Sequence, residues 1–278
     1  MKQDSSYQVP FKYFPAEGAT AQVIIAPGMG VPARFFTRLA KEFARQGLTA
    51  YIIEFRGHGE STMRASRKVD FGYKDHADDL LTICDRARTA EPDIPLYIVG
   101  HSMGGHIGLV AAAINHDKFD GLVFAGSGIP YKGYYGSLLG IGLILLAGIV
   151  SLLILVLGFF PGNIVGFAAR EARSEMRDWR HLILRSKFKV RGMGEDIHQR
   201  MARFRGRVLA FHFPDDGLVS MPVIKAALAL TPNASQEIIE VNADDLGMKS
   251  DHFNWARSPE VVVRKTRLWI EKHTPPLK

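Results

Sequence analysis

The chain has 278 residues, of which 47% are hydrophobic and 23% charged, which is typical of one large globular domain or of a domain with an insertion. Its single cysteine, Cys84, excludes an intramolecular disulfide and a cysteine-rich zinc site, so a reducing compartment is permitted. The net charge of +7 is compatible with binding to nucleic acid, with binding to an anionic membrane, or with no charged partner. Only the distribution of the charge along the chain can discriminate among these.

The first ninety residues alternate between strand and helix patterns. Apolar runs predict strands at residues 8–14, 22–26 and 48–55, and helical spacing of apolar residues predicts helices at residues 34–46 and 76–89. The loops after the second and third strands read PGMGVP and RGHGES. The first fourteen residues contain no apolar segment followed by a small-residue cleavage site, so no secretory signal is expected.

The stretch PLYIVGHSMGG, residues 95–105, joins a strand pattern to a helix pattern. Residues 96–99 predict a buried strand, and the alanine-rich run HIGLVAAAI predicts a buried helix, so Ser102 stands in a G-x-S-x-G motif between them. Gly100 and Gly104 leave room for the sharp turn that exposes a nucleophilic serine. In the alternative interpretation, the serine only caps the helix.

The alternation continues after the motif but is interrupted. Strands are predicted at residues 121–125, 207–213 and 236–241, and helices at residues 223–230 and 258–273. We therefore predict an α/β fold whose core comprises residues 1–127 and 207–278, with a mostly parallel sheet flanked by helices. Residues 128–206 are predicted to form a helical cap insertion.

Four stretches resemble motifs of the α/β-hydrolase superfamily: EFRGHGES at 54–61, GHSMGG at 100–105, FPDDGLV at 213–219 and KSDHF at 249–253. Glu54 stands where aspartate is commoner in the family, and Asp251 replaces the glycine that usually precedes the histidine. The resemblance implies an α/β-hydrolase fold and a catalytic triad of Ser102, Asp216 and His252. In such a triad the imidazole takes the serine proton and a buried carboxylate orients the imidazole.

For the acid of the triad and for the oxyanion hole, the match to the family motifs is less specific. Asp216 has the family's D-x-x-V spacing to Val219 and is preferred to Asp215, which remains an alternative. The backbone N–H groups of Met29 and Met103 would form the oxyanion hole. The loop Pro27-Gly28 departs from the usual H-G and resembles a branch of hydrolases similar to serine aminopeptidases.

Further residues of these motifs are expected to support the site rather than react. They are Gly28, Gly100, His101 and Gly104. The remaining histidines lack the i,i+4 carboxylate pairing of metal ligands, and the glycines do not fit a nucleotide-binding motif, so neither a metal nor a cofactor is expected.

Residues 138–160, LLGIGLILLAGIVSLLILVLGFF, are long and apolar enough for a membrane span. A single crossing would separate Ser102 from Asp216 and His252, so three arrangements remain: a helical hairpin dipping into one leaflet, a helix buried between cap and core, or an interfacial segment lying in the membrane. Residues 164–207 follow with twelve basic and five acidic side chains, the whole excess of the chain. An anionic lipid surface would attract this pair of segments; the alternative is a solvated cap with ion pairs of Glu171 and Glu175 to neighbouring arginines.

The sequence therefore predicts a serine hydrolase that cleaves a carboxylic ester with a hydrophobic or lipid-like acyl group through an acyl-enzyme on Ser102. The alternatives are an aminopeptidase or amide hydrolase with the same triad, and a non-catalytic membrane-associated binding module. The expected partners are the ester substrate and an anionic membrane surface, without nucleic acid. We expect a cytoplasmic protein, peripheral or monotopic at the inner face of a membrane; the sequence does not predict the oligomeric state.

Overall fold

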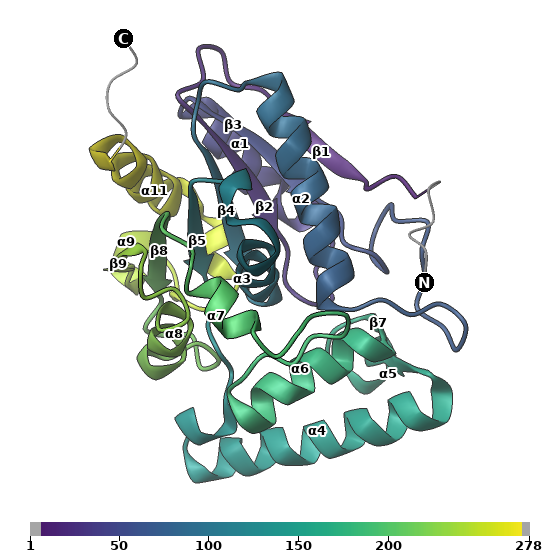
Figure 1. Ribbon diagram of the computed structural model, residues 1–278. Coiled ribbons are helices and arrows are strands. Elements are labelled where there is room, and N and C mark those ends of the chain that lie inside the picture. Colours follow the sequence, from purple (N-terminus) through teal and green to yellow (C-terminus); the bar gives the residue numbers. More distant parts are fainter. Residues whose placement is uncertain (1–6, 274–278) are drawn as a thin grey trace.

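The computed structural model describes residues 7–273 and shows a central sheet with helices on both faces (Figure 1). Its strands are β1 Phe11–Phe14, β2 Ala21–Ala26, β3 Leu48–Ile53, β4 Leu96–His101, β5 Gly121–Ala125, β8 Arg207–His212 and β9 Ser235–Glu240. They lie in the order β1-β3-β2-β4-β5-β8-β9, with β1 antiparallel to β3 and the other neighbours parallel. Residues 1–6, which enter the prediction of no secretory signal, lie outside the described range.

Every residue of β2, β3, β4 and β5 is buried, because helices cover both faces of the sheet. Helices α2 (Tyr73–Ala90) and α3 (Met103–Asn115) pack in one apolar cluster. Helices α1 (Thr37–Arg45) and α11 (Glu260–His273) pack in the cluster on the opposite face. The predicted fold class, a mostly parallel sheet flanked by helices, is confirmed.

Short helical segments account for the main differences from the predicted elements. The helix predicted at residues 34–46 begins as a 3₁₀ turn, Ala33–Phe36, before α1. The predicted helix near residues 223–230 is α8, Met221–Leu228. Four short helices were not predicted: α5 Gly162–Val165, α7 Ile197–Met201, α9 Ala243–Leu246 and α10 Asn254–Arg257. Four- and five-residue helices carry too few periodic positions to be recognised from sequence.

The segment predicted as a helical cap contains two longer helices and a small sheet. Helix α4 (Ser137–Leu157) packs on α6 (Arg173–Arg185) along the lower edge of Figure 1. Between them lie β6 (Phe159–Pro161), α5 (Gly162–Val165) and β7 (Arg170–Ala172), with β6 and β7 paired antiparallel. The buried side chains of α4 and α6 belong to the same apolar cluster as α2 and α3, so this segment has no separate core.

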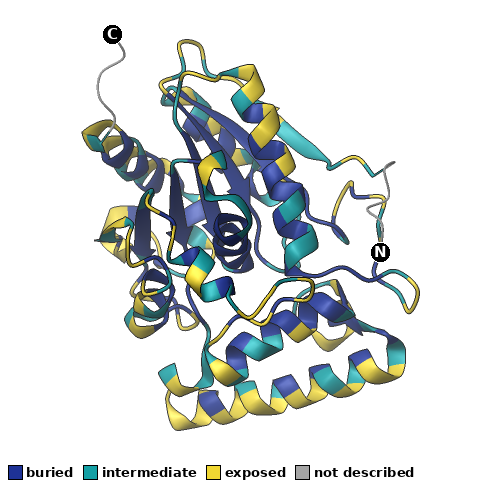
Figure 2. Cartoon of the chain, in the orientation of Figure 1, coloured by how far each residue is buried: buried dark blue, intermediate teal, exposed yellow. Residues whose placement is uncertain are grey.

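Helix α4 presents most of its apolar surface to solvent. It is the one helix within residues 7–273 that is long and apolar enough to cross a membrane. Only 22% of its most apolar 18-residue stretch is buried. Ala147, Val150 and Ile154 face α6, whereas the outer side is exposed along its whole length (Figure 2). The helix continues unbroken through Gly148 and Ser151. Helix α4 is therefore neither a hairpin nor a helix buried between cap and core.

Candidate active site

Ser102 occupies the turn between β4 and α3 with strained backbone angles, φ 50° and ψ −118°. Such a left-handed conformation costs a non-glycine residue about 1–3 kcal/mol. The turn requires glycine at two neighbours: a Cβ on Gly100 would lie 2.4 Å from the Gly105 nitrogen, and a Cβ on Gly104 would lie 2.0 Å from the Ala26 oxygen. The Ser102 side chain makes no capping hydrogen bond to α3, so the helix-cap interpretation does not describe this residue.

The structure brings His252 and Asp216 into direct contact. Nδ1 of His252 lies 2.8 Å from Oδ2 of Asp216, whose side chain is buried. The other oxygen of Asp216 accepts hydrogen bonds from the backbone N–H groups of Leu218 (2.9 Å) and Val219 (3.1 Å). A carboxylate oxygen accepts, so Nδ1–H of His252 donates this hydrogen bond, and Nε2 is the ring nitrogen that remains for proton transfer.

Asp215 has different partners from its neighbour. Its Oδ2 accepts a hydrogen bond from the Ser250 backbone N–H at 2.9 Å, and its own N–H donates to the Ser250 carbonyl at 3.0 Å. These two bonds fix the start of the loop that carries His252. Of the two adjacent aspartates, Asp216 therefore contacts the imidazole of His252, and Asp215 holds the loop that carries it.

The ring of His101 packs against the ring of His252. The two rings are 4.7 Å apart between centroids, and Nε2–H of His101 donates to the His252 carbonyl at 3.1 Å. Nε1–H of Trp255 donates to the same oxygen at 3.0 Å. Burial, and then the charge of His252, hold the pKa of His101 well below its usual value, so His101 is neutral. No sequence pattern indicated a role for Trp255, because its hydrogen bond depends on the turn made by α10.

The loop after β2 approaches the serine closely. A Cβ on Gly28 would lie 2.7 Å from Nδ1 of His101 and 3.1 Å from Cβ of Ser102. Within residues 7–273, the backbone N–H groups of Met29 and Met103 donate no hydrogen bond. Unpaired buried N–H groups are rare in proteins, and Met103 is only 1% exposed. Two free donors are therefore available where an oxyanion hole is expected.

The segment of residues 128–206 contacts the rest of the fold near this loop through a buried ion pair. Oε1 of Glu171 accepts a hydrogen bond from the Ala169 backbone N–H (2.8 Å) and lies 3.2 Å from Nε2 of His58. Burial opposes the charged form of His58, but the hydrogen bond and charge of Glu171 outweigh it and raise the pKa of His58 to about 9. Ala168, which precedes Ala169 in the chain, lies against the loop after β2, since a Cβ on Gly30 would be 2.7 Å from the Ala168 carbonyl carbon.

This ion pair predicts a loss of stability at alkaline pH. The folded-state pKa of His58 lies above the unfolded value near 6.5, so its contribution is complete below pH 6.5 and is lost as the pH rises through 9. The contribution is at most about 3 kcal/mol. Urea unfolding should show a steeper fall in the free energy of unfolding from pH 6.5 to 9 in the wild type than in Glu171→Gln.

The exposed pair His212–Glu240, at 3.0 Å, provides a control for that measurement. Glu240 has a 59% exposed side chain, so solvent screening weakens the pair. Glu240→Gln should keep the wild-type pH dependence. Equal slopes for the wild type and Glu171→Gln would contradict the assignment to His58.

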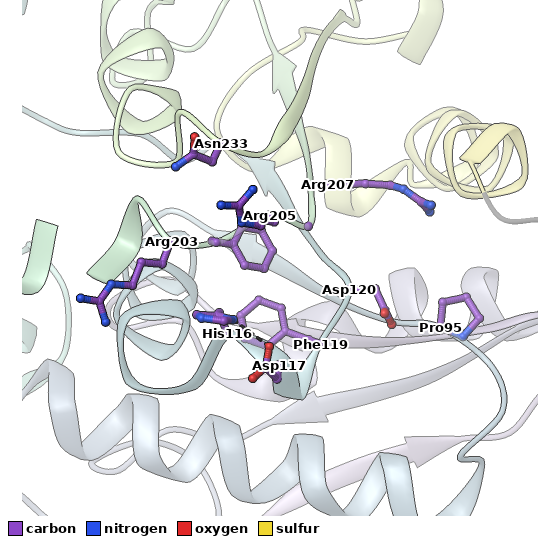
Figure 3. Close-up of a pocket in the computed structure, with 11 residues that line it drawn as sticks. Pro95, His116, Asp117, Phe119, Asp120, Arg203, Arg205, Arg207 and Asn233 are labelled. Carbon is purple, nitrogen blue, oxygen red and sulfur yellow. Dashed lines mark ion pairs between the residues drawn. The ribbon is translucent and has the colours of Figure 1, made fainter. Parts of the chain in front are cut away.

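A cavity of about 710 Å³ lies at the other edge of the sheet. Pro95, Asp120 and Arg207 on its wall stand at the amino ends of β4, β5 and β8, whereas Ser102 follows the carboxyl end of β4 (Figure 3). Ligands of parallel α/β sheets bind outside the carboxyl ends of the strands, so this cavity is not the candidate active site. Within residues 7–273, no group of three or more histidine, cysteine or acidic residues could hold a metal ion.

The strand order and the strained serine at the end of a central parallel strand define an α/β-hydrolase fold. A family model described as "Serine aminopeptidase, S33" matches residues 17–241. The chain belongs to this family.

Part of the chain is also similar to individual proteins that are named as lipases. A rat protein named monoglyceride lipase is 27% identical over 120 residues, 43% of this chain and 39% of the relative. A monoacylglycerol lipase of Mycolicibacterium smegmatis is 28% identical over 107 residues, 38% of each chain. The chain thus matches about two fifths of the length of these curated relatives.

Solved structures resemble the chain over nearly its whole length. A soluble variant of monoglyceride lipase from Saccharomyces cerevisiae has a TM-score of 0.68 at 16% identity, covering 98% of this chain and 96% of that one. A monoacylglycerol lipase from Paleococcus ferrophilus has a TM-score of 0.64 at 14% identity, covering 96% and 100%. At these identities the likeness establishes the fold.

Proposed function

We propose that the protein is a serine hydrolase that cleaves carboxylic esters through an acyl-enzyme on Ser102. The observation that carries the proposal is the 2.8 Å contact between His252 and the buried Asp216, on the same sheet edge as a strained serine with no capping hydrogen bond. Strain at a non-glycine residue is a feature of functional sites, and an imidazole oriented by a buried carboxylate is the arrangement that a catalytic histidine requires. Family membership supports a hydrolase.

In the proposed reaction, Oγ of Ser102 attacks the ester carbonyl while Nε2 of His252 takes its proton. Asp216 holds the proton on Nδ1 and stabilises the imidazolium that forms. The N–H groups of Met29 and Met103 donate to the tetrahedral oxyanion. Collapse breaks the bond to the alcohol, which leaves with the proton from Nε2. Water then attacks the acyl-enzyme by the same route and releases the carboxylic acid.

We propose an ester with a long hydrophobic acyl chain as the substrate class. The named relatives are monoglyceride and monoacylglycerol lipases, and the cap exposes an apolar helix from which such a substrate could enter. The matching family model carries the description of a serine aminopeptidase. Amide hydrolysis is therefore the second candidate.

A substrate panel separates these candidates. We expect release of fatty acid from a long-chain monoacylglycerol at a kcat/KM at least a hundredfold above that for aminoacyl p-nitroanilides. Ser102→Ala should abolish both activities. A preference for the anilides would instead establish an aminopeptidase, and no Ser102-dependent turnover of either would favour the non-catalytic module.

We further propose that residues 128–206 form the cap of the site and dock it on an anionic bilayer. Leu138, Leu145 and Leu155 on the outer side of α4 are 89%, 63% and 75% exposed. An exposed apolar face of this length marks an interaction surface, and the adjoining residues 164–207 carry the excess positive charge of the chain, which complements anionic lipid. Both ends of α4 join the same folded body, so it would lie in the interface as in a peripheral or monotopic protein of the cytoplasmic face.

A further inference from the structure

A second cavity, of about 790 Å³, lies within the cap between α6 and the chain that follows it. Its wall carries basic side chains from both segments: Arg177, Arg180, Lys187, Lys189 and Arg191. The acidic residues on the same wall are Asp178 and Glu195. This cavity, which we call the basic cap pocket, is separate from Ser102 and has no part in the proposed ester hydrolysis.

Most of the positive charge in the basic cap pocket is uncompensated. Within residues 7–273, Arg191 is paired, with Asp70 at 3.1 Å, whereas the side chains of the four other basic residues make no ion pair. Nε of Arg180 is buried and has no hydrogen-bond partner. Four cations around one cavity repel one another unless solvent or an anion lies between them.

The acidic residues of the wall do not neutralise this charge. Oδ2 of Asp178 accepts a hydrogen bond from the Tyr73 backbone N–H at 3.0 Å, and burial raises the pKa of Asp178 to about 7. Glu195 is exposed. The pKa of His181 is lowered by burial and then by Lys189, Arg185 and Arg180, in keeping with an electropositive pocket.

We propose that the basic cap pocket binds a phosphomonoester or diphosphate group, carried by a small phosphorylated compound or by a lipid headgroup such as that of phosphatidic acid. A guanidinium presents its N–H donors in a fork that matches phosphate oxygens, and Arg177 and Arg180 place two such groups on the wall. A phosphate carries more than one negative charge near neutral pH, so it compensates several cations at once, as a monovalent carboxylate does not. The cavity has room for two linked phosphates.

Inorganic pyrophosphate is a suitable probe, used in titration calorimetry on the full chain at constant ionic strength. We expect saturable binding to one site, weakened at least tenfold in Arg177→Gln/Lys189→Gln. Both side chains belong to exposed residues, so the substitutions leave the core intact. The matched control is Arg203→Gln/Arg205→Gln, which removes the same charge at the cavity of Figure 3 and should change the affinity less than twofold.

Absence of saturable binding, or equal weakening in the two double variants, would overturn the proposal. The second outcome would mean that pyrophosphate responds only to net charge. Thermal unfolding of both variants checks that they fold. Lys189→Gln alone should weaken binding severalfold, and an unchanged affinity in that variant would also count against the pocket.

Vesicles of phosphatidylcholine with about 10 mol% phosphatidic acid, an anionic lipid of the kind that attracts basic segments, separate the two sources of the phosphate. If pyrophosphate displaces the wild type from these vesicles, the pocket binds the lipid headgroup. If pyrophosphate binds but displaces nothing, and Arg177→Gln/Lys189→Gln floats as the wild type does, the ligand is a soluble phosphorylated compound. Both results support a phosphate site in the basic cap pocket, and they differ in whether its ligand is a lipid or a soluble compound.

Discussion

Asn in place of Asp216 is expected to lower the turnover of p-nitrophenyl butyrate on the order of 10³- to 10⁴-fold. The asparagine oxygen can still accept from the N–H groups of Leu218 and Val219, which leaves its amide N–H₂ facing Nδ1 of His252. Nδ1 must then accept a hydrogen bond, so Nε2 carries the proton. In that tautomer the imidazole cannot take the proton of Ser102.

Asp215→Asn is the matched control for this substitution. It makes the same chemical change at the neighbouring residue, and an asparagine oxygen can still accept from the Ser250 N–H. We expect its turnover to stay within about tenfold of the wild type, since Asp215 acts only through the loop. Comparable losses in the two variants, or a larger loss in Asp215→Asn, would reassign the acid.

Replacing two exposed leucines on the outer side of α4 by glutamate is expected to release the protein from lipid. Leu145 and Leu152 are 63% and 61% exposed, so Leu145→Glu/Leu152→Glu leaves the packing against α6 intact. Burying two leucine side chains in lipid contributes about 3 kcal/mol or more, which corresponds to roughly a hundredfold in partitioning. Flotation with vesicles of phosphatidylcholine and phosphatidylglycerol should therefore fall from mostly bound to mostly free.

The control for flotation makes the same charge change on α11, away from the cap. Leu268→Glu/Arg264→Gln alters two exposed residues there and should float as the wild type does. Hydrolysis of a soluble ester by the α4 variant should remain at the wild-type rate. If both double variants float equally, α4 does not dock the protein on lipid.

The core of the fold was predictable because its signals are local and strong. Strands such as residues 121–125 are short apolar runs between helices, and β5 has those bounds. The motif around Ser102 also carries its own context, because the glycines at 100 and 104 are required by contacts within the turn and with β2. The order of the four motifs then placed Asp216 and His252 at the same sheet edge.

The junction of the cap with the core was not predictable in the same way. The alternative of a solvated cap places Glu171 and Glu175 in surface ion pairs with neighbouring arginines. Both glutamates are instead fully buried, and they lie 3.2 Å and 3.3 Å from the core histidines His58 and His76. Their partners are separated from them by about a hundred residues of chain. Periodicity cannot report such contacts, because it describes one element at a time.

The two buried pairs also differ in charge, which no local pattern indicates. Hydrogen bonding and charge from Glu171 keep His58 ionised. Burial holds the pKa of Glu175 well above its usual value and lowers that of His76 to about 4, so the second pair is neutral. Which pair is ionised depends on the whole environment of the cap junction.

The most direct test of Ser102 as nucleophile is labelling of the full chain with a fluorophosphonate probe, followed by mass spectrometry of the labelled peptide. The account predicts one adduct per chain, on Ser102, which is lost in Ser102→Ala and strongly slowed in Asp216→Asn. Equal labelling of the wild type and Ser102→Ala, or an adduct on another serine, would contradict it.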